Sequence, residues 1–176
     1  MATHDNQANL SAEAISEYLL LARFGLDHRK ADGGCLGYPS TLLLFCVIDA
    51  LSNHMGMPPH SYGLLNKSPF SLNLTPDQIE HLKIWYRDML AHNGMIQPGT
   101  ILTPEAEGKP IELVNGEPVK IRVHALFRLA AQAWEDFQQN AKMKTRSTKP
   151  PKARFDISQV PAASSACPPI FKPRKL

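Results

Sequence analysis

Apolar residues recur at intervals of three and four in several stretches of this chain, which is the pattern of helices that bury one face. The first stretch predicts a helix from about residue 11 to residue 26, with Ser11 as the N-cap. Its inward face is expected to consist of Ile15, Tyr18, Leu19, Ala22 and Leu26. A second helix is expected over residues 40–55. The run TLLLFCVIDAL in that stretch is apolar nearly all round, so this helix should lie in the centre of the fold.

The third predicted helix has the clearest start signal. Thr75 suits the N-cap, Pro76 the first helical position and Gln78 the glutamine position of a capping box. Gly94 provides a stop at the other end. The apolar positions that follow at helical spacing are Ile79, Leu82, either Trp85 or Tyr86, Met89 and Ile96.

A short β section is expected between the third helix and the last one. Residues 111–114 and 119–123 flank the dipeptide Asn115-Gly116, the strongest short signal for a hairpin turn. A fourth helix is expected over residues 124–140. Its inward positions are Leu126, Leu129 or Ala130, Ala133, Trp134 and Phe137.

These elements predict a mainly α fold, a four-helix up-and-down bundle with a small β-hairpin inserted before the last helix. The connections between the helices differ in character. Residues 27–39 form a linker that contains glycines and ends in proline, whereas residues 56–74 form a long loop without a hydrophobic pattern. Loops of that length are often functional or mobile.

Length and composition fit one domain, because the chain has 176 residues, of which 43% are hydrophobic and 20% charged. The longest apolar run, residues 42–48, is far shorter than the roughly twenty residues that cross a membrane. The first residues have neither the basic start nor the apolar segment of a secretory signal, so we expect a cytoplasmic protein. The cysteines Cys35, Cys46 and Cys167 are far apart and odd in number, which favours free thiols over disulfides or a metal site.

Charge divides the chain into two parts. Residues 142–176 hold nine of the nineteen lysines and arginines but one acid, a net charge of +8, whereas residues 1–141 have a net charge of −5. The basic part is rich in proline, serine and alanine, a composition that cannot bury enough apolar area to fold. We therefore expect a flexible N-terminus over 1–9, a helical domain over 10–141 and a disordered basic tail over 142–176. The tail either attracts polyanions such as RNA or DNA, or serves solubility alone.

The candidate chemistry lies at the end of the third predicted helix, in the sequence WYRDMLAHNG. Arg87 and His92 are five positions apart, and a polar residue, Asp88, directly follows the arginine. This pattern on a capped helix resembles the signature of the HEPN family, small helical domains of which many are metal-independent endoribonucleases. A second pair at the same spacing, Arg23 and His28, departs from the pattern, because an apolar residue follows the arginine and the histidine falls beyond the first helix.

The resemblance implies that RNA is cleaved by attack of the 2′-hydroxyl on the adjacent phosphate, without a metal or cofactor. Such a reaction needs a group that transfers protons near pH 7 and a fixed cation for the charge that develops on the phosphoryl oxygens. Histidine and arginine have these properties. In this interpretation Arg87 stabilises the transition state and His92 transfers protons. Asp88, four residues before His92, orients the imidazole.

Residues five positions apart on a regular helix point about 140° apart, so Arg87 and His92 of one chain form half a site. The resemblance implies a homodimer in which two copies of the motif meet at one cleft. Two supporting residues are expected, Asn93 beside His92 and Asp49 in the apolar second helix. An ionised carboxylate in that helix needs a partner, for which Arg87 is the candidate, unless Asp49 faces solvent.

Other interpretations stay open. Arg87, Asp88 and His92 are also ordinary residues for the end of an exposed helix, where a cationic histidine interacts favourably with the helix dipole. A non-catalytic HEPN-like module that binds RNA, a nucleotide or a protein partner needs only the surface and the tail. A third alternative is a plain interaction or assembly protein. The resemblance also covers toxins, so an inhibitor or antitoxin is a further candidate partner. The remaining histidines, including His54 and His60, show no acidic residue at metal-ligand spacing, and no glycine-rich nucleotide-binding motif is present.

Overall fold

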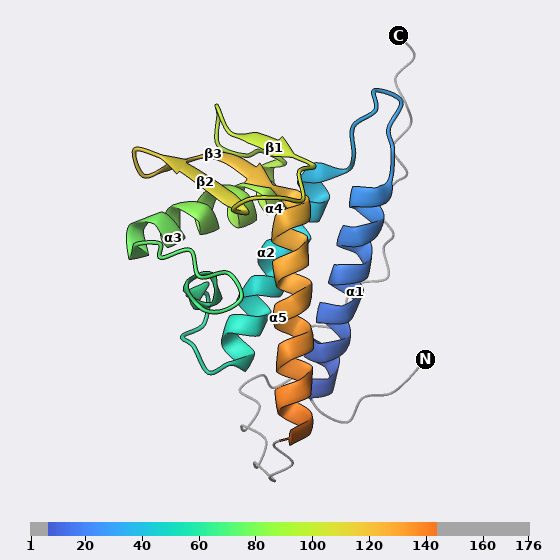
Figure 1. Cartoon of the computed structure of the whole chain (residues 1–176), viewed down its shortest axis with the longest axis vertical. Coiled ribbons are helices and arrows are strands. Elements are labelled where there is room, and N and C mark those ends of the chain that lie inside the picture. The colour runs from blue at the N-terminus through green and yellow to red at the C-terminus, as the bar shows by residue number, and fades with distance from the viewer. Residues whose placement is uncertain (1–6, 144–176) are drawn as a thin grey trace, which may run out of the picture. The chain divides into compact units, whose positions relative to one another are not determined.

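Three long helices form the main layer of the fold. The computed structural model describes residues 7–143, and the side chains of residues 10–140 among them. α1 (Gln7–Asp27) packs on α2 (Gly37–His54), and both contact α5 (Val123–Met143). Figure 1 shows these three helices running side by side.

The second helix is the central one, as its apolar sequence predicts. It contacts α1, α5 and the third helical region, and its residues without exposed surface include Leu44, Phe45, Val47, Ile48 and Leu51. The helix begins at Gly37, earlier than the expected residue 40. Pro39 does not prevent this start, because the first N–H groups of a helix have no acceptor within the helix.

The first helix starts earlier than predicted and buries a narrower face. It begins at Gln7, so residues 7–9 are helical and Ser11 is not the N-cap. The Ser11 hydroxyl instead forms a hydrogen bond with Nε2 of His54 at 2.8 Å. Tyr18 was expected in the core but is 37% exposed, whereas Ile15, Leu19, Ala22 and Leu26 are buried as predicted.

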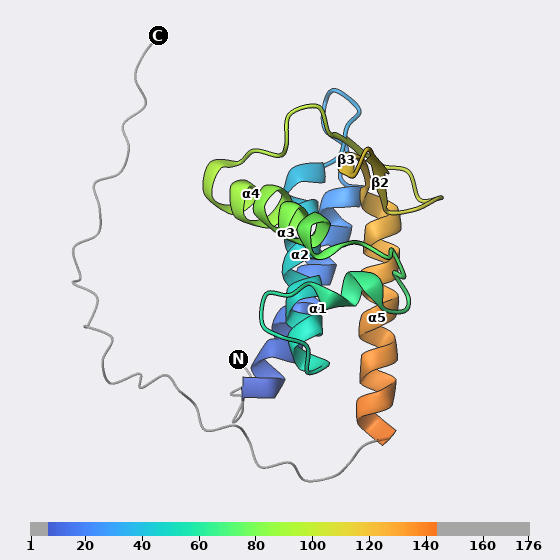
Figure 2. The same cartoon turned by 90° about the vertical axis from the view of Figure 1, so that its left-hand side faces the viewer.

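The third helical region is continuous from Pro76 to Asn93 but changes its winding. It consists of α3 (Pro76–Lys83), a π-helical segment η2 (Ile84–Asp88) and α4 (Met89–Asn93). The N–H of Met89 donates to the carbonyl oxygen of Ile84, five residues earlier, which is the π-helical pattern. Figure 2 shows this region crossing α2, so the expected up-and-down arrangement holds for α1, α2 and α5 but not for the third helix.

Both end signals of the third helix are confirmed. The Thr75 hydroxyl accepts from the Gln78 N–H at 3.3 Å, and Gln78 Oε1 accepts from the Thr75 N–H at 2.9 Å, which completes the capping box. Gly94 ends the helix in the left-handed conformation with a φ of 63°. This value favours glycine, since a Cβ atom is strained there.

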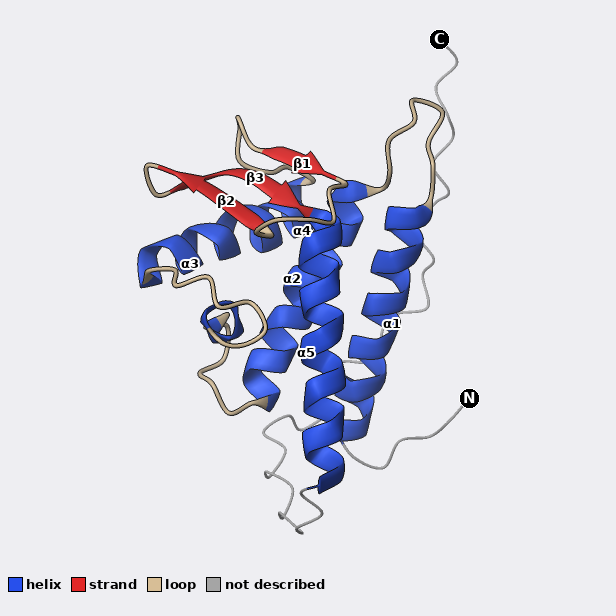
Figure 3. Cartoon of the chain, viewed as in Figure 1, coloured by secondary structure: helices blue, strands red, loops and turns tan. Residues whose placement is uncertain are grey.

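A three-stranded sheet replaces the simple hairpin that the sequence predicts. β2 (Ile111–Val114) and β3 (Glu117–Arg122) are antiparallel and joined at Asn115-Gly116, where both residues have positive φ, so the hairpin itself is confirmed. β1 (Ile101–Thr103) was not predicted and pairs with β3 in parallel, which gives the order β1-β3-β2. Figure 3 shows the sheet beside the third helical region, at the end of α5 where that helix begins.

The long loop between α2 and α3 is anchored at several points. It contains a short 3-10 helix, η1 (Gly63–Asn66). The Leu64 N–H donates to the Ser52 hydroxyl at 3.2 Å, which ties η1 to α2. The Asn66 side chain donates to the Leu74 carbonyl and accepts from the Leu74 N–H, both at 2.7 Å. The loop therefore has a definite path across α2.

Some sequence predictions lie outside the described residues. These are the flexibility of residues 1–6 and the disorder of residues 144–176, which include Cys167, whereas residues 142 and 143 form the last positions of α5. Cys35 and Cys46 are free thiols. Among the described helices, we find none that combines the length and the hydropathy of a membrane span.

Candidate functional site

Arg87 and Asp88 lie at the end of the π-helical segment and form an ion pair with each other. Arg87 Nη1 donates to Asp88 Oδ1 at 2.7 Å, and the two side chains are 36% and 35% exposed. This hydrogen bond raises the pKa of the Arg87 guanidinium above its usual value. We expected Asp88 to orient His92, but the structure pairs it with the arginine instead.

His92 lies in the last turn of α4 and is exposed to solvent. Its neighbour Asn93 is also exposed and donates from Nδ2 to the sulfur of Met89 at 3.2 Å. Neither residue lines the pocket that contains Arg87. Within one copy of the chain, His92 and Arg87 therefore do not line the same pocket.

Tyr86 fixes the position of the motif helix. Its side chain is fully buried and stacks on Phe45 of α2, with 6.0 Å between the ring centroids. Its hydroxyl forms a 2.6 Å hydrogen bond with Thr100 Oγ1, and Thr100 donates in turn to the carbonyl oxygen of Pro118 at 3.1 Å. Of the two aromatic residues considered for this inward position, Tyr86 is the fully buried one, and Trp85 is half-buried. The β section thus braces the residue that precedes Arg87.

Asp49 has a different partner from the one expected. It lies on α2 with a side chain that is 17% exposed, and its Oδ2 atom accepts from Nδ1 of His60 at 2.9 Å. Its other oxygen, Oδ1, is buried and has no hydrogen-bond partner among the described residues. The expectation that Arg87 pairs with Asp49 is corrected, because Arg87 pairs with Asp88.

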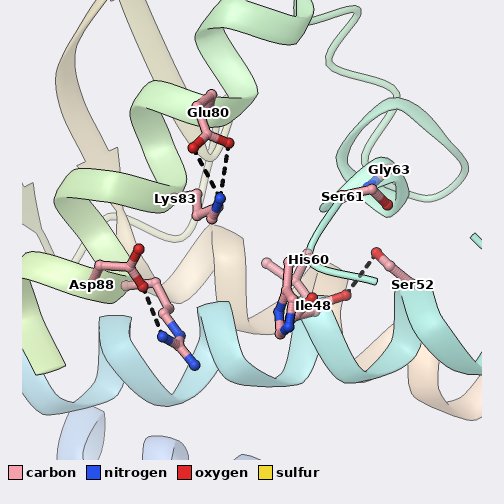
Figure 4. Close-up of polar contacts among 10 residues, drawn as sticks. Ile48, Ser52, His60, Ser61, Gly63, Glu80, Lys83 and Asp88 are labelled. Atoms are coloured by element: carbon pink, nitrogen blue, oxygen red, sulfur yellow. Dashed lines mark hydrogen bonds and ion pairs between the residues drawn. The ribbon is translucent and has the colours of Figure 1, made fainter. Parts of the chain in front are cut away.

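One pocket brings Arg87 and Asp88 together with three further side chains. Its volume is about 180 Å³, and it is lined by His60, Tyr62, Lys83, Arg87 and Asp88. At about 30 Å³ per water molecule, it has room for several waters or for one small ionic group. Figure 4 shows Lys83 and Asp88 projecting from the third helical region, with His60 on the other side, and α2 runs below them.

The pocket lining contains two cationic side chains and one acidic side chain. Lys83 and Arg87 are charged, and His60 becomes charged when it is protonated, whereas Asp88 is the acid in the lining. Lys83 also binds Glu80 through both carboxylate oxygens, at 2.9 and 3.0 Å. Two side chains with a fixed positive charge, beside the imidazole of His60, suit an anionic ligand such as a phosphate.

The Tyr62 hydroxyl and the Cys46 thiol have raised pKa values. Burial raises the pKa of the Tyr62 hydroxyl well above 10, and the nearby Asp49 adds to that effect. Burial also raises the pKa of the Cys46 thiol, an effect that Arg87 opposes and Asp49 reinforces. Both groups are therefore neutral near pH 7.

Three residues of the pocket were not predicted from the sequence. Tyr62 and Lys83 carry no spacing signal, and His60 was considered without an acidic partner. The structure supplies that partner, Asp49, which precedes His60 by eleven positions. The path of the long loop brings the two together, and no regular helical or strand spacing would have shown it.

A second, larger cavity lies at the far end of α2 and suits an anion less well. It has a volume of about 900 Å³, and its lining includes His54, Asp136 and Phe137. Burial lowers the pKa of His54, so this histidine is predominantly neutral near pH 7. Among its lining residues, Asp136 is the one with a fixed charge. The pocket at Arg87 is therefore the better candidate for phosphate chemistry.

Comparisons with protein-family models, curated proteins and solved structures find no significant match to this chain. Within the described residues, no three histidine, cysteine, aspartate or glutamate side chains gather as metal ligands would.

Proposed function

We propose that this protein cleaves RNA by attack of a 2′-hydroxyl on the adjacent phosphate, without a metal, at a site that two copies of the chain share. The observation that carries the proposal is the pocket where Arg87 and Lys83 present two fixed cations. A bidentate arginine suits the phosphoryl oxygens on which negative charge develops in this reaction.

In this proposal Arg87 binds the phosphate and His92 of a second copy transfers a proton. The need for a second copy follows from geometry, since His92 is exposed and lies outside the pocket of its own chain. Asp88 holds the guanidinium of Arg87 in place through the 2.7 Å ion pair. The basic residues 142–176 supply further attraction for the polyanion.

The alternative function is a non-catalytic module that binds RNA, a nucleotide or a protein partner. One observation favours it: His92 does not line the pocket that contains Arg87 in the same copy of the chain. A binding module requires the cationic pocket but does not require His92 in it.

The test measures cleavage of a mixed-sequence RNA in the presence of EDTA, with DNA of the same sequence alongside. We expect RNA fragments that end in cyclic phosphates, intact DNA, and loss of cleavage in Arg87→Ala and His92→Ala. The chain offers matched controls, because Arg23 and His28 have the same spacing, and Arg23 forms a separate ion pair with Asp27. Arg23→Ala and His28→Ala should cleave as the unaltered protein does.

Mixing tests whether the site is shared. If two copies form one site, a mixture of Arg87→Ala and His92→Ala protein regains activity, because mixed dimers contain one intact arginine and one intact histidine. If the unaltered protein binds RNA but does not cleave it, the nuclease function is overturned and the binding module remains as the function. If the mixture of the two variants stays inactive while the unaltered protein cleaves RNA, the shared site is excluded.

A further inference from the structure

We propose that His60 is a second proton-transfer residue of the site, the base that removes the 2′-hydroxyl proton, and that Asp49 positions it. This inference rests on the proposed function and adds a residue to it. RNA cleavage by this route needs two proton transfers, one from the attacking hydroxyl and one to the leaving oxygen. His92 can carry out one of them.

The hydrogen bond between His60 and Asp49 defines which ring nitrogen is available. An ionised carboxylate accepts hydrogen bonds and does not donate them, so Nδ1 of His60 carries the hydrogen in the 2.9 Å contact with Asp49 Oδ2. In the neutral imidazole the other nitrogen, Nε2, then holds a free electron pair. The His60 side chain is 65% exposed and lines the same pocket as Arg87, so Nε2 is accessible to a bound ligand.

The hydrogen bonding of Asp49 fits a residue that positions His60. Its Oδ1 atom is buried without a hydrogen-bond partner among the described residues, and its bond to His60 satisfies Oδ2 alone. A buried carboxylate oxygen without a hydrogen bond is costly to the fold. Such groups call for a functional explanation, and orientation of the imidazole supplies one.

The backbone of the loop holds His60 in a conformation that few residues adopt. His60 has a φ of 57° and Tyr62 has a φ of 49°, both in the left-handed region. These conformations are strained for residues other than glycine, and such residues gather at functional sites when the surrounding structure enforces them. The surrounding structure fixes Tyr62, since its side chain is 1% exposed and packs against Phe45 with tilted ring planes and 6.0 Å between the centroids.

In the proposed step His60 acts as the base and His92 of the second copy as the acid. Nε2 of His60 accepts the proton of the 2′-hydroxyl as the 2′ oxygen forms its bond to phosphorus. Arg87 binds the phosphoryl oxygens while this charge develops. The bond from phosphorus to the 5′ oxygen breaks, and that oxygen takes a proton from the imidazolium of His92 of the second copy. The products are a 2′,3′-cyclic phosphate and a 5′-hydroxyl, and the two histidines have exchanged protonation states.

A substrate with an activated leaving group distinguishes the base from the acid. Nitrophenolate leaves without a proton, so nucleoside 3′-(4-nitrophenyl phosphates) need the base but not the acid. On RNA we expect His60→Ala and His92→Ala each to lose about 10²-fold to 10⁴-fold in rate. On the nitrophenyl substrates His92→Ala should regain most of its rate, and His60→Ala should not. His28→Ala is the matched control for both.

The role of Asp49 has its own readout, which does not require catalysis. Nitrogen-15 NMR of the His60 ring should show the Nδ1–H tautomer in the unaltered protein, and Asp49→Asn should shift the balance towards Nε2–H. The same variant should lose less activity than His60→Ala, and Asp27→Asn should change neither measurement.

Each outcome points to a different conclusion. If the unaltered protein cleaves RNA and Arg87→Ala does not, but His60→Ala keeps full activity, His60 is not the base and the proposed nuclease remains. Recovery of His60→Ala on the nitrophenyl substrates would assign it the acid role and overturn its role as base. If the unaltered protein cleaves neither substrate, the nuclease and the role of His60 fail together.

Discussion

The hydroxyl of Tyr86 lies 2.6 Å from Oγ1 of Thr100, which links the helix that carries Arg87 to the segment that leads into β1. Tyr86 is fully buried, so this bond lies at the junction between the third helical region and the β section. The residues between the third helix and the last one therefore support the candidate site. A simple four-helix bundle would lack this support.

Removal of the Tyr86 hydroxyl should weaken this junction. We expect Tyr86→Phe to lower the free energy of unfolding by about 1 kcal/mol, because the ring still packs on Phe45 while the short hydrogen bond with Thr100 and a longer one to Gln97 are lost. Urea denaturation measures the change. Tyr38→Phe is the control, since Tyr38 is 53% exposed. Equal stability of both variants would show that the 2.6 Å contact contributes nothing.

The capping box at the start of α3 should contribute a similar amount. We expect Thr75→Ala to cost about 1 kcal/mol, because the Gln78 N–H loses its acceptor. Thr75→Ser keeps a hydroxyl in the same position and should be close to neutral. Thermal denaturation of both variants checks the prediction, which fails if serine is as destabilising as alanine.

The central position of α2 makes its leucines sensitive to truncation. Leu44 has no exposed surface, so Leu44→Ala should destabilise the protein by about 2–5 kcal/mol through lost burial and the cavity that remains. Leu20 on α1 is 70% exposed, and Leu20→Ala should change stability by no more than about 0.5 kcal/mol. Similar losses in both variants would contradict the burial assigned to α2.

Burial of Tyr62 should make the fold sensitive to alkali. The pKa of its hydroxyl is raised in the folded state above the ordinary value of 10.0, so the folded protein holds this proton more tightly than the unfolded chain. Its contribution to stability is complete below about pH 10 and is lost as the pH rises above that value. The slope for one such group reaches about 1.4 kcal/mol per pH unit.

Denaturation at a series of alkaline pH values measures this slope. Tyr62→Phe should make the fall in stability shallower but should not abolish it, because the pKa of Tyr86 is also raised by burial. Tyr38→Phe should leave the slope unchanged. An unchanged slope in Tyr62→Phe would mean that the Tyr62 hydroxyl is not buried.

Local signals in the sequence predicted the helices and the hairpin well. The box at Thr75, the stop at Gly94 and the turn at Asn115-Gly116 each depend on a few adjacent residues, and all three are confirmed. β1 was missed because its three residues, Ile101–Thr103, are defined by pairing with β3 rather than by their own pattern. A strand this short has too few residues to show an alternation.

The candidate site was only partly predictable, for the same physical reason. Arg87 and Asp88 are adjacent in sequence and meet in the structure, but the partner of Asp49 depends on how a nineteen-residue loop, residues 56–74, crosses α2. His60 and Tyr62 adopt the left-handed conformation and set that path. Neither position is a glycine, the residue that would have indicated this conformation in the sequence. The roles of Arg87 and His92 remain predictions.

The π-helical segment has a consequence for how this helix can change in evolution. A π turn holds one residue more than an α turn, so loss of one residue between Ile84 and Asp88 would restore regular α winding. The π turn advances about as far around the helix axis over five residues as an α turn does over four, so the residues on either side of the deletion would keep nearly the same orientation relative to one another. A single codon deletion in this stretch would therefore leave His92 on nearly the same side of the helix relative to α3, whereas the same deletion within α3 would turn it by about 100°.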